Sequence, residues 1–121
     1  MIGSERMKKL SICDIEGVVV KNNETYLLKD NTDLKNLVLS STTLHPNKET
    51  RGHDHPGQEE VYFFVSGQGS MYLIHDDVHV YEFDVGPGDV VQIPDGWFHK
   101  VKNTGDKDLY FVCVFDGKRS H

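Results

Sequence analysis

The residues of this chain best suited to chemistry are histidines and glutamates gathered in two short stretches. The first, residues 53–60, reads HDHPGQEE, and the second, residues 88–103, reads GDVVQIPDGWFHKVKN. Together they supply three imidazoles and a carboxylate, which is a common ligand set for a divalent transition metal. The two stretches therefore predict a metal site.

The spacing inside the first stretch has a structural interpretation. His53 and His55 are two residues apart, so on a strand their side chains point to the same face. The Pro-Gly pair that follows predicts a turn, after which residues 60–66 read as a strand. A hairpin of this kind can return Glu60 to the two histidines. Glu59 and Glu60 are neighbours, so only one of them can share that face.

The order of these residues resembles the two motifs of the cupin superfamily. Its first motif reads glycine, five residues, His-x-His, three or four residues, Glu, six residues and glycine. Residues 53–67 fit it, and Asn47 stands at the leading glycine. Asn is the best substitute for Gly in a left-handed turn. The second motif matches at every position, namely at Gly88, Pro94, Gly96, His99 and Asn103.

The resemblance implies an all-β fold, a double-stranded β-helix or jelly-roll barrel, with a metal at its mouth. It places the metal ligands at His53, His55, Glu60 and His99, with Glu60 favoured over Glu59 by spacing. One divalent transition metal per chain is expected, either Mn, Fe, Ni, Co or Zn. Three histidines and one carboxylate leave two positions of an octahedron open for a ligand.

Short apolar runs separated by Gly, Asn and Asp clusters agree with an all-β fold. We expect a disordered lead-in over residues 1–9, the barrel over 10–116 and a flexible tail over 117–121. The expected strands cover residues 17–21, 24–29, 35–45, 50–55, 60–66, 70–75, 79–84, 90–93, 98–103 and 108–115.

Composition narrows the range of partners. The net charge of −6 argues against nucleic acid, and no apolar stretch approaches the ~18 residues of a membrane span. No signal peptide is visible, and Cys13 and Cys113 read as free thiols, so a cytoplasmic protein is expected. The partner expected for the metal site is a small molecule. In the strand over residues 60–66, Val61, Phe63 and Val65 share the face opposite Glu60 and need cover. Either the second sheet or another subunit could supply it, and we expect a homodimer.

Two further side chains are candidates for catalysis. Arg51 lies two residues before His53, so it either points into the barrel and binds an anionic group of a ligand, or is exposed or paired at the rim. Tyr62 shares the face of Glu60 and offers a hydroxyl for proton transfer or orientation, or serves only as pocket wall. Trp97 and Phe98 either form a lip over the metal or pack in the core.

Three functions fit this site. The first, which we favour because the chain resembles cupins grouped with mannose-6-phosphate isomerase, is a metal-dependent isomerase or epimerase of a sugar or sugar phosphate. The second is a non-haem metal dioxygenase acting on a small organic substrate. The third is a non-catalytic cupin that binds a metal or a small ligand.

Overall fold

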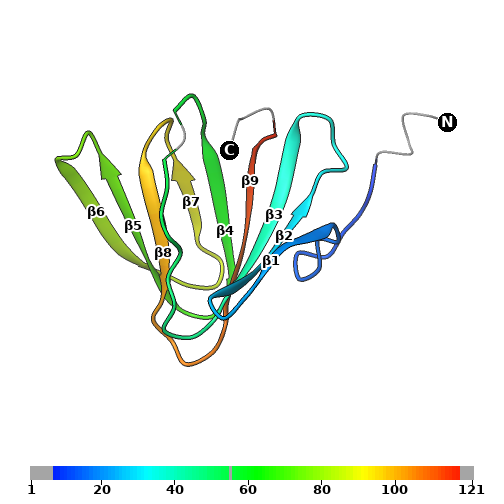
Figure 1. Ribbon diagram of the computed structural model, residues 1–121, viewed down its shortest axis with the longest axis horizontal. Coiled ribbons are helices and arrows are strands. Elements are labelled where there is room, and N and C mark those ends of the chain that lie inside the picture. Colours follow the sequence, from blue (N-terminus) through cyan, green and yellow to red (C-terminus); the bar gives the residue numbers. More distant parts are fainter. Residues whose placement is uncertain (1–6, 55, 118–121) are drawn as a thin grey trace.

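A computed structural model describes residues 7–54 and 56–117 of the chain, which form nine strands in two antiparallel sheets (Figure 1). Strand bounds follow the apolar runs of the sequence. The strands are β1 (Val18–Asn22), β2 (Tyr26–Asn31), β3 (Leu37–Leu44), β4 (Glu60–Ser66), β5 (Gly69–His75), β6 (His79–Val85), β7 (Val90–Ile93), β8 (Phe98–Asn103) and β9 (Leu109–Asp116).

The larger sheet has the order β1-β2-β3-β9-β4-β7, and the smaller has the order β6-β5-β8. In Figure 1 the two sheets lie face to face, meet at the lower end and diverge towards the upper end, where β4 and β8 begin. Strands distant in sequence are neighbours in both sheets, which is the topology of the predicted jelly roll. No described segment forms a helix with the length and apolar character that crossing a bilayer requires.

The hydrophobic core fills the space between the two sheets. In β4, residues 60, 62 and 64 are buried while 61, 63 and 65 are only half-buried. Successive side chains of a strand point to opposite faces, so one face of β4 points into the core. The core includes Leu44, Tyr62, Phe64, Met71, Leu73, Val85, Val91, Ile93, Val101, Leu109, Phe111, Cys113 and Phe115.

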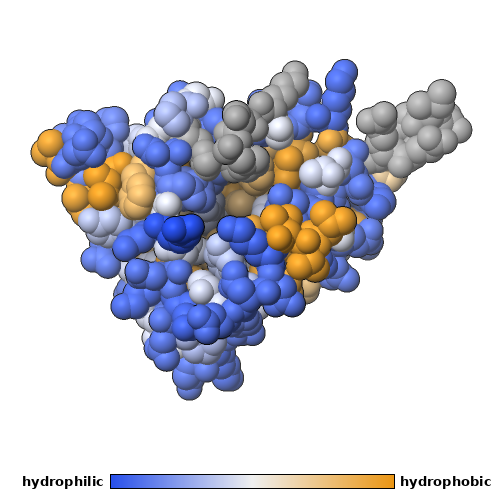
Figure 2. Space-filling view, in the orientation of Figure 1, coloured by the Kyte–Doolittle hydropathy of each residue, from blue (hydrophilic) through white to orange (hydrophobic). Residues whose placement is uncertain are grey.

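The outer face of the larger sheet is covered in part by the segment before β1. Leu10, Ile12 and Ile15 lie with Phe63 and Val112 around an apolar groove on this face. The Tyr110 hydroxyl donates a hydrogen bond to the Ile12 carbonyl (2.8 Å) and ties the segment to β9. Figure 2 also shows apolar residues gathered at β1. The three valines of this strand are all exposed.

One expected strand differs from the structure. Residues 50–55 were expected to form a regular strand, but the described part of that range makes only an isolated bridge, between His53 and His99. Glu49 is paired with Lys102, and His53 is paired with His99. His53 is four positions after Glu49, whereas Lys102 is only three positions after His99. One residue is therefore extra, and the segment forms a β-bulge beside β8.

Glycine permits the bulge. Gly52 has φ of 82°, and a Cβ at this position would lie 2.4 Å from the Phe98 ring. A side chain here would thus meet both a backbone penalty and a steric one. Asn47, at the position of the motif's leading glycine, has φ of 64°, which confirms the left-handed turn expected there.

Candidate metal centre

Three of the four predicted ligands converge between the sheets. His53, Glu60 and His99 each offer a ligand atom, and these atoms lie within 4.8 Å of one another. Glu60 begins β4, His99 lies in β8, and His53 follows the bulge. His55 lies outside the described residues, so the structure neither adds it to this group nor removes it.

Reciprocal backbone hydrogen bonds hold the two histidines together. The His53 amide donates to the His99 carbonyl (3.1 Å), and the His99 amide donates to the His53 carbonyl (3.0 Å). Their rings meet edge to face with centroids 4.5 Å apart. The spacing of these two candidate ligands is therefore set by the backbone of the fold.

The His99 ring is oriented by a second hydrogen bond. Its Nδ1 lies 3.1 Å from the Trp97 carbonyl oxygen, and because a carbonyl can only accept, Nδ1 carries the proton. In the neutral imidazole Nε2 then holds a lone pair, which is the form that binds metal.

That lone pair faces a carboxylate. His99 Nε2 lies 3.1 Å from Glu60 Oε2, and both side chains are 3% exposed. Despite the short distance, Nε2 makes no hydrogen bond to any described residue. Two buried acceptors side by side need a proton or a metal cation between them. Adjacent ligands held at about 2.1 Å in an octahedron lie about 3.0 Å apart, so the pair fits a metal ion.

Glu60 rather than Glu59 belongs to this group. Glu60 is 4% exposed, whereas Glu59 is exposed to solvent. The Gly57 amide, in the turn that precedes both glutamates, donates a 2.6 Å hydrogen bond to Asp95 Oδ1. The turns of the two motifs are thereby joined at the mouth of the barrel.

Tyr62 lies beside the candidate ligands, whereas Arg51 lies at the surface. The Tyr62 ring meets the His99 ring edge to face, with centroids 5.7 Å apart, and stacks on Phe111 at 5.3 Å. Arg51 is exposed. The bulge interrupts the strand alternation from which an inward Arg51 was inferred. A catalytic role for either residue remains a prediction.

The two aromatic residues before His99 take different positions. Phe98 lies on the opposite face of β8 from His99, against Gly52, so it is not part of an inner lip. Trp97 is half-buried and stacks on His75 with centroids 4.6 Å apart and on Tyr81 at 5.6 Å. Neither His75 nor Tyr81 was a candidate site residue from the sequence.

Asn103, the last residue of the second motif, has a structural role. It is fully buried, and its Nδ2 donates to the carbonyls of Leu44 and Lys107, both at 2.8 Å. Its Oδ1 accepts a 2.9 Å hydrogen bond from the Gly105 amide. These bonds fix the turn after β8.

The chain is similar to two kinds of enzyme. The chain is 29% identical over 106 residues to glucose-6-phosphate isomerase of Thermococcus kodakarensis and 30% identical to that of Thermococcus litoralis. These matches cover 81% of this chain and 56% of the isomerases, so the chain spans about half of their length. Oxalate decarboxylase OxdC of Bacillus subtilis is 31% identical over 67% of this chain and 21% of its own.

The fold itself matches solved structures. A structure of Bacillus subtilis oxalate decarboxylase, a protein with Mn(II) centres, superposes with a TM-score of 0.77 at 24% identity, over 85% of this chain and 28% of that one. The model of the cupin domain family matches residues 40–115. Because that region is more than half of the chain and contains both motifs, the protein belongs to the cupin domain family.

Proposed function

We propose that this cupin binds one divalent transition metal through His53, His55, Glu60 and His99, and isomerises a sugar phosphate. The observation that carries the metal site is the pair of buried acceptors, His99 Nε2 and Glu60 Oε2, 3.1 Å apart. Similarity to glucose-6-phosphate isomerases over 81% of the chain supports the reaction.

The reaction needs only proton movements. Converting an aldose phosphate into a ketose phosphate moves one proton from carbon 2 to carbon 1 and another between the oxygens on those carbons, with no external oxidant. A bound metal would supply Lewis-acid polarisation of those oxygens. The protein must hold the substrate carbons beside a group that accepts and returns the proton.

Two side chains are proposed for these tasks. Tyr62 is 7% exposed and lies against the His99 ring, so it is suited to orient or protonate a substrate oxygen. Arg51 is exposed beside the bulge, two residues from His53, and is suited to bind the phosphate, because a guanidinium binds phosphate through two hydrogen bonds.

Metal analysis and an isomerase assay test the proposal. Chelator-treated protein would be loaded separately with Mn, Fe, Ni, Co or Zn, and ketose formation from glucose 6-phosphate measured. About one metal per chain and turnover with at least one metal is expected. Tyr62→Phe should lower kcat, while Arg51→Gln should raise KM. Failure to retain any of the five metals contradicts the site, and a loaded protein without turnover contradicts the isomerase.

Oxygen uptake separates the other enzyme class from this proposal. A dioxygenase consumes O2 in proportion to substrate, whereas the isomerisation consumes none. The same loaded samples, placed in an oxygen electrode with a panel of small organic acids, distinguish the two reactions.

We also propose a homodimer that covers the outer face of the larger sheet. Val90, 56% exposed, is paired with Phe63, so it shares the outward face with the apolar groove. Val90→Lys should shift the protein towards monomer in sedimentation velocity. Val80→Lys on the smaller sheet is the matched control, because Val80 is 52% exposed. Equal sedimentation of Val90→Lys and wild type contradicts this interface.

A reducing compartment is the third part of the proposal. Cys13 is exposed and Cys113 is buried, and both are free thiols. An exposed thiol is stable in the cytoplasm, where glutathione and thioredoxin keep cysteines reduced. Fractionation of cells that express the tagged protein at its natural level tests this localisation.

A further inference from the structure

Aromatic side chains lie uncovered on the inner face of β5 and β6. Tyr81 and Phe83 are paired with Leu73 and Met71, which are core residues, and paired residues share a face of the sheet. Even so, Tyr81 is 46% and Phe83 39% exposed. Inward-facing aromatic residues of a barrel are ordinarily buried, so this part of the interior is open.

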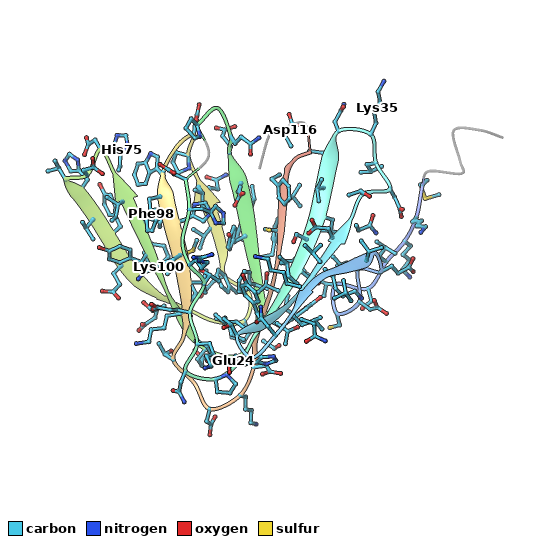
Figure 3. The ribbon with its side chains drawn as sticks, in the orientation of Figure 1. Glu24, Lys35, His75, Phe98, Lys100 and Asp116 are labelled. Atoms are coloured by element: carbon cyan, nitrogen blue, oxygen red, sulfur yellow. The ribbon has the colours of Figure 1, made fainter. Side chains whose placement is uncertain are left out.

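Trp97 and His75 extend this surface towards the upper end of the barrel. Trp97 lies nearly parallel to His75, with an interplanar angle of 11°, and to Tyr81, with an angle of 24°. Figure 3 shows His75 at the upper end of β5. We call these four residues, His75, Tyr81, Phe83 and Trp97, the aromatic shelf.

The aromatic shelf is continuous with the candidate metal centre. Leu73 is paired with His99 on one side and with Tyr81 on the other, and His99 is paired with His53. One row on the inner face therefore runs through Tyr81, Leu73, His99 and His53. With strands about 4.8 Å apart, the Tyr81 backbone lies about 10 Å from that of His99. The Trp97 carbonyl, in turn, accepts the hydrogen bond from His99.

We infer that the aromatic shelf is a subsite for the pyranose ring of a sugar phosphate beside the metal centre, where its C1 and C2 react after the ring opens. The inference rests on the proposed function. An aromatic face is negative at its centre and attracts the partly positive C–H hydrogens on the apolar face of a pyranose ring.

The aromatic shelf therefore separates the two kinds of relative. Glucose 6-phosphate has a ring that can stack on aromatic side chains, whereas oxalate has no apolar face. A site built for oxalate has no need of exposed aromatic residues at this distance. Their presence favours a ring-bearing substrate.

The single tryptophan of the chain, Trp97, allows a direct test. Metal-loaded protein would be titrated with glucose 6-phosphate while tryptophan emission is recorded, and glycerol 3-phosphate would serve as the probe that keeps the phosphate but lacks the ring. We expect saturable binding of glucose 6-phosphate and at least about tenfold weaker binding of glycerol 3-phosphate, as the stacking contacts are lost.

Variants on one strand assign the effect to the aromatic shelf. Tyr81→Ser should weaken glucose 6-phosphate binding about three- to tenfold, the range expected for one lost aromatic contact, and Tyr81→Phe should restore it. The control is Val80→Ser, since Val80 is next in sequence and 52% exposed but lies on the opposite face. Metal content, measured for every variant, should not change.

The outcomes keep the two proposals apart. The subsite is overturned if wild-type emission shows no saturable change, if both probes bind equally, or if Tyr81→Ser binds as wild type does. Binding that depends on the Tyr81 ring, without turnover on any metal, supports the subsite and refutes the isomerase.

Discussion

Replacing Glu60 with Gln tests the metal centre most directly, and Glu59 provides a matched control one residue away. Both changes remove one negative charge and keep the shape of the side chain. Glu60 is 4% exposed with Oε2 3.1 Å from His99 Nε2, whereas Glu59 is exposed. Only Glu60→Gln should therefore change metal binding.

The size of the effect follows from linkage. At a free metal concentration of 100 times Kd, binding stabilises the folded protein by about 2.7 kcal/mol. A chain of 121 residues has an unfolding entropy of about 0.25 kcal/mol/K, so this corresponds to a rise in Tm of about 11 °C. Loss of a direct ligand should cost more than the about 100-fold seen for outer-shell partners. The stabilisation by metal then falls to about 0.4 kcal/mol or less, which corresponds to a rise in Tm of under about 2 °C.

The assay is thermal unfolding by circular dichroism, with metal and with excess chelator, for wild type and both variants. The quantity compared is the difference in Tm between the two conditions, which cancels any change in the metal-free protein. The reasoning is refuted if Glu60→Gln keeps the wild-type gain, or if Glu59→Gln loses it.

Three further predictions concern the backbone and one exposed ion pair. Asn47→Ala should destabilise the fold by about 1 kcal/mol in urea unfolding, while Asn47→Gly should not, because φ is 64°; equal stability of the two contradicts this. Gly52→Ala should abolish the metal-dependent gain in Tm, whereas Gly57→Ala, with nothing within 4 Å of its Cβ, should show only the backbone cost; equal effects exclude steric contact as the cause. The pKa of Asp76 is lowered, chiefly by its hydrogen bond with His79, so this stabilisation is present above the ordinary carboxyl pKa and is lost as pH falls through the lowered one. His79→Ala should return the pKa towards the ordinary value in an NMR titration, and an unchanged pKa refutes the hydrogen bond as its cause.

The sequence predicted the elements that depend on local pattern and spacing. The alternation in β4 placed Glu60, Tyr62 and Phe64 on the inner face, where the structure has them buried. The motif spacing selected Glu60 over Glu59, and the left-handed turn at Asn47 followed from its place in the motif. These features depend on residues close in sequence.

The bulge and the exposure of Tyr81, which depend on how distant segments pair and pack, were not predicted. The inference that Arg51 and His53 point to the same face assumed a continuous strand. In the structure this segment has one extra residue relative to β8. Gly52 inside the expected strand is the signal that could have indicated a bulge. Tyr81 read as an ordinary strand residue, because nothing in its own segment shows that the opposite sheet leaves it uncovered.

The reciprocal backbone bonds between His53 and His99 have a kinetic consequence. Each residue's amide is held by the other's carbonyl, so a fluctuation that separates the two segments exposes both amides to solvent and pulls apart two of the proposed metal ligands at once. Metal escape and deuterium uptake at these two positions then share one opening event. Where metal loss and amide exchange are both faster than reclosing, the rate at which excess chelator strips the metal should equal the opening rate measured by hydrogen exchange, and conditions that slow one should slow the other equally.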